Sequence, residues 1–190
     1  MNIKKIHVAY IVSQLGTSGP TKQLSYIIDG LDFSEFSVSI ITLSKENNQS
    51  LKSEFSNYSI EYYCLDSRSS SNLFMAYFSL RKLTNQLQID LLHSQGIRAD
   101  MCCAFLRKIP RISSQRNNPF EEYPPLYGQF RGYFMACLHI FALRRIDQVV
   151  TCSKTLSLED KRYQIPATYI RNGIPILPKR SDLAEPSSIS

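Results

Sequence analysis

Short apolar runs rich in β-branched residues alternate along the chain with longer stretches in which apolar residues are spaced as on a helix. The runs cover residues 6–12, 37–43, 60–65, 89–94, 110–115, 148–153 and 167–172. Strands that alternate with helices in this way are typical of a parallel sheet covered by helices. The pattern therefore predicts an α/β fold with a Rossmann-like open parallel sheet and helices on both of its faces.

Several signals predict where the helices lie. Helical spacing is clearest at Leu24, Ile27, Ile28 and Leu31 and at Leu73, Tyr77, Leu80 and Leu87. Pro20 is placed to begin a helix, because a first helical residue can do without its amide proton. Arg107 and Lys108 predict the end of one helix, and residues 143–145 the end of another that begins near Tyr127, because cations oppose the negative end of a helix dipole.

The chain of 190 residues has the length and composition of one soluble globular domain. Residues 117–128 are rich in proline and polar side chains, and we predict an irregular segment there. We assign residues 1–175 to the domain and residues 176–190 to a linker-like tail, which we interpret as the start of a further part.

Two apolar segments of the chain could be taken for a signal peptide or a membrane span, and neither has the features of one. Lys4 and Lys5 precede the first apolar run as in a signal peptide, but the run is short and lacks a small-residue cleavage site, which favours a first strand. The longest apolar stretch, residues 133–143, is far shorter than the ~20 residues of a spanning helix.

The five cysteines lack ligand spacing and are predicted to be reduced core residues: Cys64, Cys102, Cys103, Cys137 and Cys152. We expect a cytoplasmic protein.

The net charge of +6 lies in the second half of the chain. Nine Lys and Arg balance nine Asp and Glu up to Leu106, whereas thirteen face seven from Arg107 onward. Two interpretations are open: an anionic partner that meets this half, or a well-solvated basic surface. A nucleic acid is disfavoured as the partner, because the cations do not interleave with aromatic residues in any reader motif.

Polar or glycine-rich segments follow five of the predicted strands. In an open parallel sheet these loops meet at one edge, where ligands bind. We therefore predict substrate-binding residues at Gly16, Thr17, Ser18, Gly19, His93, Arg98, Arg116, Asn117, Ser153, Lys154, Asn172 and Gly173. Each segment also has a structural explanation: a tight turn at residues 16–19, a hydrogen-bonded histidine at residue 93, a sheet-edge arginine at residue 116 and a helix cap at residue 153.

Searches for other catalytic signatures find nothing. The chain has no third glycine of a dinucleotide fingerprint, no P-loop, no Asp-x-Asp, no His-Glu-x-x-His and no Gly-x-Ser-x-Gly. Glu121 and Glu122 are adjacent, with nothing to mark them as an acid/base pair. We expect no metal ion and no cofactor, and the sequence names no catalytic residue.

The segments at the predicted sheet edge resemble the N-terminal half of a family 4 glycosyltransferase with the GT-B fold. "LGTSGPTKQLSYIIDGL" is similar to the family's glycine-rich loop and helix, and "DLLHSQGIRADMCCAFL" to its Asp-x-x-His-Ser-x-Gly segment. "IDQVVTCSKTL" and "YIRNGIP" resemble its Val-x-x-Ser-Lys and Asn-Gly-Ile segments. Each motif is weak by itself, and together, in order, they extend from about Ile6 to Pro175.

The resemblance implies transfer of a sugar from a nucleotide donor to an acceptor, with retention of configuration and without a metal ion. The N-terminal half would hold the acceptor, often a lipid-linked sugar at the cytoplasmic membrane face, while the loop at residues 16–19 reaches the donor phosphate or sugar. The helix from Tyr127 to Arg145 would then meet an anionic membrane or a lipid pyrophosphate through Arg131 and residues 144–145, or else pack in a core or against a partner domain.

Two departures from the family pattern stand out. Arg116 occupies the place of a common family histidine, and "RNNPFEEY" is similar to an Arg-Asn-x-Pro-x-Glu-x-Tyr segment of a polysaccharide-synthesis subgroup. An arginine stays protonated, so its role there would be electrostatic or positional. The second, nucleotide-sugar-binding domain with its pair of glutamates is not found in the chain.

Our first hypothesis is accordingly the acceptor-side half of a retaining glycosyltransferase for cell-surface polysaccharide, without turnover when alone. The alternative is a non-catalytic subunit that docks a glycosyltransferase partner or membrane lipid. In either case the protein would be cytoplasmic, with a peripheral position on the inner face of the cytoplasmic membrane left open.

Overall fold

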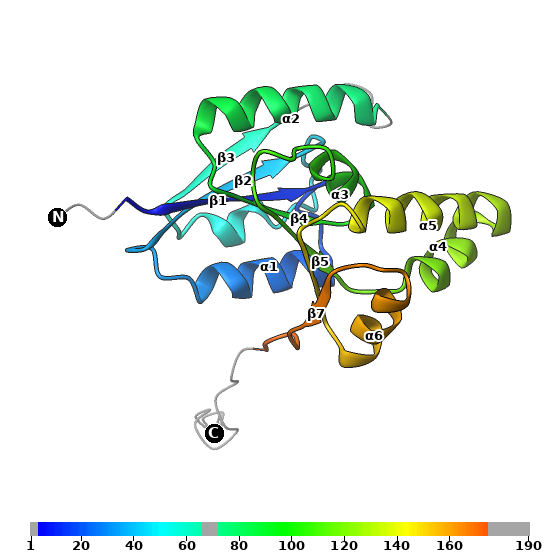
Figure 1. Cartoon of the computed structure of the whole chain (residues 1–190). Coiled ribbons are helices and arrows are strands. Elements are labelled where there is room, and N and C mark those ends of the chain that lie inside the picture. The colour runs from blue at the N-terminus through cyan, green and yellow to red at the C-terminus, as the bar shows by residue number, and fades with distance from the viewer. Residues whose placement is uncertain (1–3, 66–71, 175–190) are drawn as a thin grey trace, which may run out of the picture.

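A computed structural model describes residues 4–65 and 72–174, and its centre is a sheet of seven parallel strands (Figure 1). The strands are β1 (Ile6–Val12), β2 (Phe36–Thr42), β3 (Ile60–Cys64), β4 (Leu91–Gln95), β5 (Arg111–Gln115), β6 (Gln148–Thr151) and β7 (Ala167–Tyr169). All seven predicted strands are present, and the predicted open parallel sheet is confirmed. The tail at residues 176–190 lies outside the described residues.

The strand order is β3-β2-β1-β4-β5-β6-β7, so the direction of chain progress reverses between β1 and β4. Val12, the last residue of β1, pairs with Thr42 in β2 and Gln95 in β4. The carboxyl ends of these three strands are therefore level. Ligands bind beyond such a reversal point in open α/β sheets, because the loops diverge there.

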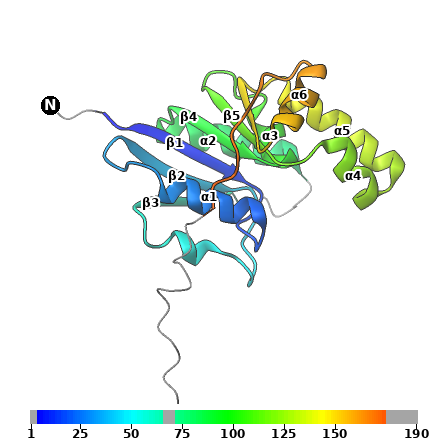
Figure 2. The same ribbon diagram turned by 90° about the horizontal axis from the view of Figure 1, so that it is seen from below.

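Helices cover both faces of the sheet (Figure 2). They are α1 (Gly19–Asp29), the 3-10 helix η1 (Lys52–Phe55), α2 (Leu73–Leu87), α3 (Ile97–Cys103), α4 (Pro119–Tyr127), α5 (Gln129–Leu143) and α6 (Lys154–Arg162). Helix α1 and η1 pack on one face through Leu24, Ile28 and Phe55. Helices α2, α3 and α5 pack on the other and bury a larger apolar core.

Helix α4 corrects the prediction of an irregular segment at residues 117–128. Asn118 caps it, because its Oδ1 accepts from Phe120 N at 3.0 Å, and Pro119 occupies a first-turn position that needs no amide proton. Pro124 and Pro125 lie inside the helix, where each lacks the N–H of a helical bond. Packing against α5 compensates, and the close approach depends on Gly132, which has no side chain to meet Pro124.

Two smaller predictions also change. Helix α3 ends at Cys103, and Arg107 and Lys108 lie in the turns that follow, so they do not end a helix. Cys102 and Cys103 are buried in the core as predicted, whereas Cys64 and Cys137 are exposed and Cys152 is half-buried, so these three are not core residues. The predicted end of the other helix is confirmed, since α5 stops at Leu143.

Candidate substrate-binding cleft

Three cavities lie side by side at the carboxyl edge of the sheet and meet at Arg116. The central cavity, of about 380 Å³, lies beyond β1, β4 and β5. The α4–α6 cavity, of about 420 Å³, lies between the first turns of those two helices. The β6–β7 cavity, of about 380 Å³, lies against the last strands. We call the three together the cleft.

The glycine-rich loop at residues 16–19 borders the central cavity. Ser18 Oγ accepts a hydrogen bond from Thr21 N at 3.4 Å and caps α1, and Ser18 and Pro20 line the cavity. A Cβ at Gly16 or Gly19 would meet no atom within 4 Å, so the space beside this backbone is open. Thr17 instead turns away, because its hydroxyl donates to Gln49 O at 2.9 Å. The amino-terminal end of α1 thus faces the cavity, where its dipole favours an anion.

Arg116 follows β5 and lines all three cavities. Its Nη1 donates to Asn172 Oδ1, while its Nε is buried and has no hydrogen-bond partner among the described residues. Burial lowers the pKa of this guanidinium from its usual value, and the group remains a cation. A positive group with unused donors suits a phosphate or carboxylate.

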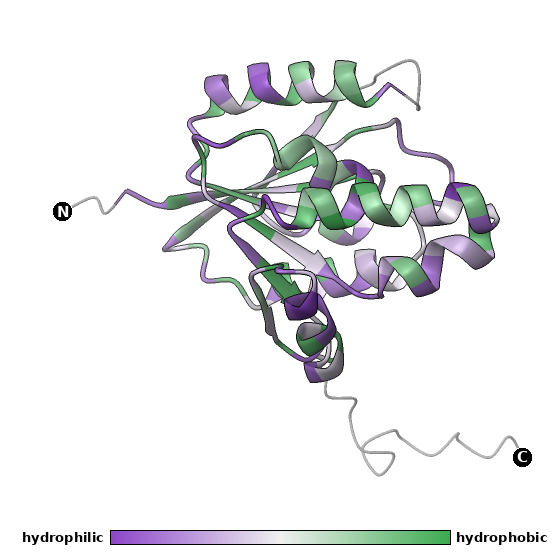
Figure 3. Ribbon diagram, turned by 45° about the vertical axis from the view of Figure 1, so that its right-hand side comes forward, coloured by the Kyte–Doolittle hydropathy of each residue, from purple (hydrophilic) through white to green (hydrophobic). Residues whose placement is uncertain are grey.

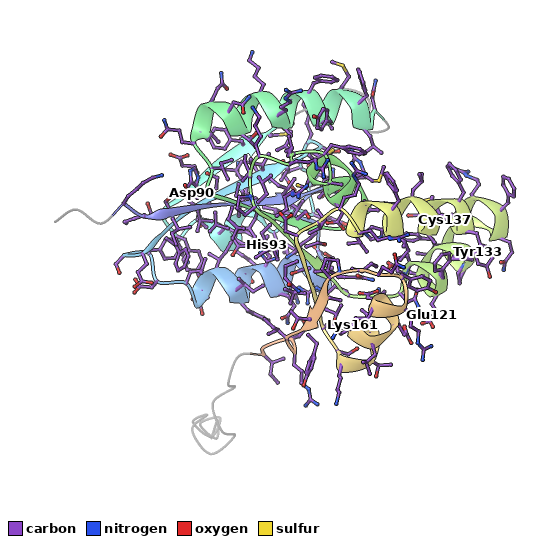
Figure 4. All side chains as sticks on the ribbon, in the orientation of Figure 1. Asp90, His93, Glu121, Tyr133, Cys137 and Lys161 are labelled. Carbon is purple, nitrogen blue, oxygen red and sulfur yellow. The ribbon has the colours of Figure 1, made fainter. Side chains whose placement is uncertain are left out.

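His93 lies in β4 and lines the β6–β7 cavity (Figure 4). Its Nε2 shares a hydrogen bond with Ser114 Oγ at 2.8 Å, and its ring lies 4.9 Å from that of Tyr10. Loss of hydration lowers the pKa of His93 to about 4. The nearby cation of Arg116 also lowers this pKa, whereas the carboxylate of Asp100 raises it. The imidazole is therefore neutral near pH 7 and serves as a hydrogen-bonding group rather than as a cation.

Two more side chains bring unused donors to the central cavity. Gln95, at the end of β4, is 8% exposed, and its Nε2 has no partner within the part of the chain that the structure describes. Arg98, in the first turn of α3, donates from Nη1 to Ser44 Oγ at 2.9 Å, while its Nη2 is buried and unpaired within the same part. Buried donors without partners are costly, so these nitrogens indicate a place where a ligand oxygen would be stabilised.

The remaining predicted residues lie around the rim. Asn117 lines the central and α4–α6 cavities. Asn172 and Gly173 line the β6–β7 cavity, and Gly173 O accepts from Gln23 Nε2 at 2.9 Å, which ties the segment after β7 to α1. Ser153 lines the α4–α6 cavity and caps α6 through Leu156 N at 3.1 Å. Lys154 begins α6 but lines none of the three cavities.

A buried polar chain behind the central cavity was not predicted from the sequence. Ser94 Oγ donates to Asp100 Oδ1 at 2.5 Å, and His139 Nε2 donates to Asp100 Oδ2 at 2.8 Å. Tyr123 OH lies 2.7 Å from His139 Nδ1, which completes a link from β4 through α3 and α5 to α4. These residues are at most 6% exposed. The one sequence signal for them is a histidine and an aspartate on otherwise apolar helix faces.

Carboxylates gather on the opposite side of Arg116. Glu121, Glu122 and Glu159 line the α4–α6 cavity, and Asn118 Nδ2 donates to Glu159 Oε2 at 3.1 Å. Within residues 4–65 and 72–174, no three His, Cys, Asp or Glu side chains are grouped as a metal ion would require. In the same described residues, no helix has the length and apolar character to cross a bilayer.

Solved structures define the class of this fold. The chain is similar to sucrose-phosphate synthase from Thermosynechococcus elongatus (10% identity, TM-score 0.63, covering 88% of this chain and 48% of that one). It is similar to the lipopolysaccharide outer core galactosyltransferase WaaB (12% identity, TM-score 0.63, covering 92% of this chain and 50% of that one). It is also similar to UDP-N-acetylglucosamine 2-epimerase from Rickettsia bellii (12% identity, TM-score 0.62, covering 87% of this chain and 44% of that one). The chain spans about half the length of these proteins, and identities this low show the fold alone.

The class is thus one Rossmann-like half of the GT-B architecture. No curated protein matches the chain. Residues 18–176 match Glycosyltransferase Family 4, and the chain belongs to this family.

Proposed function

We propose that this chain is the acceptor-side half of a retaining glycosyltransferase that moves a sugar from a nucleotide-sugar donor to a lipid-linked saccharide acceptor in cell-surface polysaccharide synthesis. Family membership supports sugar transfer. The family resemblance is the ground for expecting retention of configuration and no metal ion. The described residues form one Rossmann-like half, and the proposal assigns the donor nucleotide to a second domain, as the family resemblance implies.

The observation that carries the proposal is the position of Arg116 at the junction of the three cavities. A saccharide diphosphate has two chemically different ends. Its diphosphate would accept hydrogen bonds from the guanidinium groups of Arg116 and Arg98, which both line the central cavity. Its sugar would lie among neutral polar groups, such as Asn117 in the central cavity or His93 in the β6–β7 cavity.

The neighbouring loop supports a second anion site. The amino-terminal end of α1 and the open backbone at Gly16 and Gly19 would let a donor phosphate approach without meeting a side chain. Both phosphates would then bind at the central cavity, the acceptor phosphate at Arg116 and the donor phosphate at Ser18. Transfer requires the two bound substrates to be held close together.

Binding to the purified chain tests the proposal. We would titrate the ¹⁵N-labelled protein with a short-chain polyprenyl diphosphate saccharide and follow the Nε–H resonance of Arg116, for which the free chain has no partner. The resonance should shift on binding. Arg116→Ala should weaken binding about tenfold or more, since hydrogen bonds to charged groups contribute ~1.5–3 kcal/mol. Arg116→Lys should restore part of the affinity, because it keeps the charge but not the planar fork.

Arg162→Ala is the matched control, since Arg162 is an exposed arginine in the last turn of α6 and lines none of the cavities. It should bind like the unmodified chain. The proposal fails if the saccharide diphosphate does not bind, or if Arg116→Ala binds as tightly as Arg162→Ala.

A further inference from the structure

His139 is the one polar side chain among the buried residues of α5. Figure 3 shows apolar residues over much of the length of this helix. The side chain is hydrogen-bonded at both ring nitrogens, to Asp100 Oδ2 at 2.8 Å and to the Tyr123 hydroxyl at 2.7 Å. Apolar side chains of the same shape would give a core of about the same stability, so stability alone does not explain this polar chain.

The protons of the polar chain all point toward Asp100. Its Oδ1 accepts from Ser94 Oγ at 2.5 Å, and its Oδ2 accepts from His139 Nε2. A carboxylate only accepts, so the neutral imidazole carries its proton on Nε2 and leaves Nδ1 as an acceptor. Among the residues that the structure describes, Nδ1 is the only hydrogen-bond partner of the Tyr123 hydroxyl. A buried hydroxyl proton is normally bonded, so this one is donated to His139.

This direction decides what Tyr123 can offer to a ligand. Its single proton is held by His139, so the phenolic oxygen has only lone pairs left and can only accept. Burial raises the pKa of Tyr123, so the group stays a neutral hydroxyl. Tyr123 lines the central cavity. A ligand group that meets this oxygen must therefore donate a hydrogen bond, as a hydroxyl does, and an ionised phosphate or carboxylate would be repelled.

Other side chains of the central cavity have the opposite preference. Arg98 and Arg116 line it and can only donate. Gln95, which is 8% exposed, adds an Nε2 that has no partner within the described part of the chain. One cavity of about 380 Å³ therefore holds cationic donors together with a neutral acceptor. The ligand that satisfies both carries an anion and a hydroxyl, as a saccharide phosphate does.

We propose that the Tyr123 oxygen accepts a hydrogen bond from a hydroxyl of the acceptor saccharide, while Arg116 holds the diphosphate. Asp100 and His139 are positioning residues, because they keep the Tyr123 proton turned away from the cavity. The inference rests on the proposed function and adds a residue that selects the sugar. A saccharide with a carboxylate at this place, such as a uronic acid, would find no donor at Tyr123.

The direction of the hydrogen bonds can be measured in the free chain. The ¹⁵N signals of an imidazole distinguish a nitrogen that carries a proton from one that accepts, and the chain has 3 histidines to assign. Near neutral pH, His139 should show a protonated Nε2 and an unprotonated Nδ1. A protonated Nδ1, in a neutral or a cationic ring, would overturn the inference, because the Tyr123 oxygen would then accept from His139 and its proton would be free for the cavity.

Binding measurements show whether a ligand uses the acceptor. Tyr123→Phe should bind a short-chain polyprenyl diphosphate saccharide about fivefold more weakly than the unmodified chain, because one neutral hydrogen bond is lost. Inorganic diphosphate has no sugar hydroxyl and should bind both proteins equally. Tyr133→Phe is the matched control, since it removes a hydroxyl from an exposed position on α5 that lines none of the three cavities. It should change neither affinity. Circular dichroism checks that each variant is folded.

A set of monodeoxy saccharide diphosphates identifies the hydroxyl that is bound. One member should bind the unmodified chain about fivefold more weakly than the full saccharide does. The same member should bind Tyr123→Phe as tightly as the full saccharide does, because the contact is already absent. A residue that only supports the fold would not produce this coupling between one tyrosine hydroxyl and one sugar hydroxyl.

The outcomes separate this inference from the proposed function. If the unmodified chain does not bind the saccharide diphosphate, both are overturned. If it binds and Arg116→Ala weakens binding, but no monodeoxy saccharide is coupled to Tyr123, the inference alone is overturned. The same holds if Tyr123→Phe weakens the binding of inorganic diphosphate and of the saccharide by the same factor, because Tyr123 would then only shape the cavity.

Discussion

Gly132 is the contact at which α5 crosses α4, and replacing it with alanine should separate the two helices. A Cβ at this position would lie 2.4 Å from both Pro124 Cα and Pro124 N, and 2.6 Å from Tyr123 C. Ordinary contact begins at 3.4 Å. All three neighbours are backbone atoms and cannot rotate away, so the helices must part by about 1 Å.

The cost of this change has three parts. Overpacking of this kind costs about 1–3 kcal/mol. A displacement of about 1 Å would lengthen the 2.7 Å hydrogen bond between Tyr123 and His139 beyond bonding distance and leave buried polar groups unpaired, at about 1–3 kcal/mol. Alanine is the better helix former, by about 1 kcal/mol. We expect Gly132→Ala to lower the free energy of unfolding by about 1–5 kcal/mol.

Urea denaturation followed by circular dichroism measures the effect. Gly30→Ala is the matched control, since its Cβ would lie at an ordinary 3.6 Å from the nearest atom, Tyr26 O, and it should change stability by no more than about 0.5 kcal/mol. A double-mutant cycle with Tyr123→Phe tests the mechanism: removing the hydroxyl should cost less when Gly132 is already alanine. The reasoning is refuted if Gly132→Ala and Gly30→Ala unfold at the same urea concentration, or if the two changes are additive.

Three further substitutions test the pKa values of His93 and Asp160 and the capping of α6. The pKa of His93 is lowered from 6.5 to about 4, so between these values the unfolded chain binds more protons and the stability of the fold decreases as the pH drops. His93→Gln should reduce this decrease, and an equal decrease in both proteins would contradict the lowered pKa. Burial raises the pKa of Asp160 from 3.8 to about 6, so ionisation of this carboxyl lowers the stability of the fold as the pH rises. The stability of Asp160→Asn relative to the unmodified chain should therefore increase from about pH 4 to pH 7. A relative stability that does not change with pH would contradict the raised pKa. Ser153→Ala removes the cap of α6 and should cost about 1 kcal/mol in urea denaturation, whereas no loss would mean that the cap bond is not formed in solution.

The failed prediction at residues 117–128 has a local cause. Proline-rich composition argues against a helix wherever backbone bonds decide stability. Here Asn118 and Pro119 start the helix correctly, and contacts with α5 outweigh the bonds that Pro124 and Pro125 cannot make. Those contacts depend on Gly132, which the sequence does not mark as a partner of residue 124.

The cleft illustrates the same division. The strand ends were predicted, and the carboxyl edge of a parallel sheet brings them together, so Arg116, Asn172 and His93 all line the β6–β7 cavity. The partners of Asp100 were not predicted. Its hydrogen bonds reach His139 and, through it, Tyr123, on helices whose packing no local pattern specifies.

The sequence alone determined the order of the strands, the parallel sheet and the edge at which the polar strand ends meet, because hydrophobic period and chain direction are local properties. Only the tertiary structure decided which side chains keep unpaired donors in the cleft and which exposed rings join into one surface. Phe74, Phe105 and Phe141 are unrelated in sequence and become neighbours because α2, α3 and α5 pack on the same face of the sheet. Burial and pairing depend on such long-range packing, and a linear pattern does not contain it.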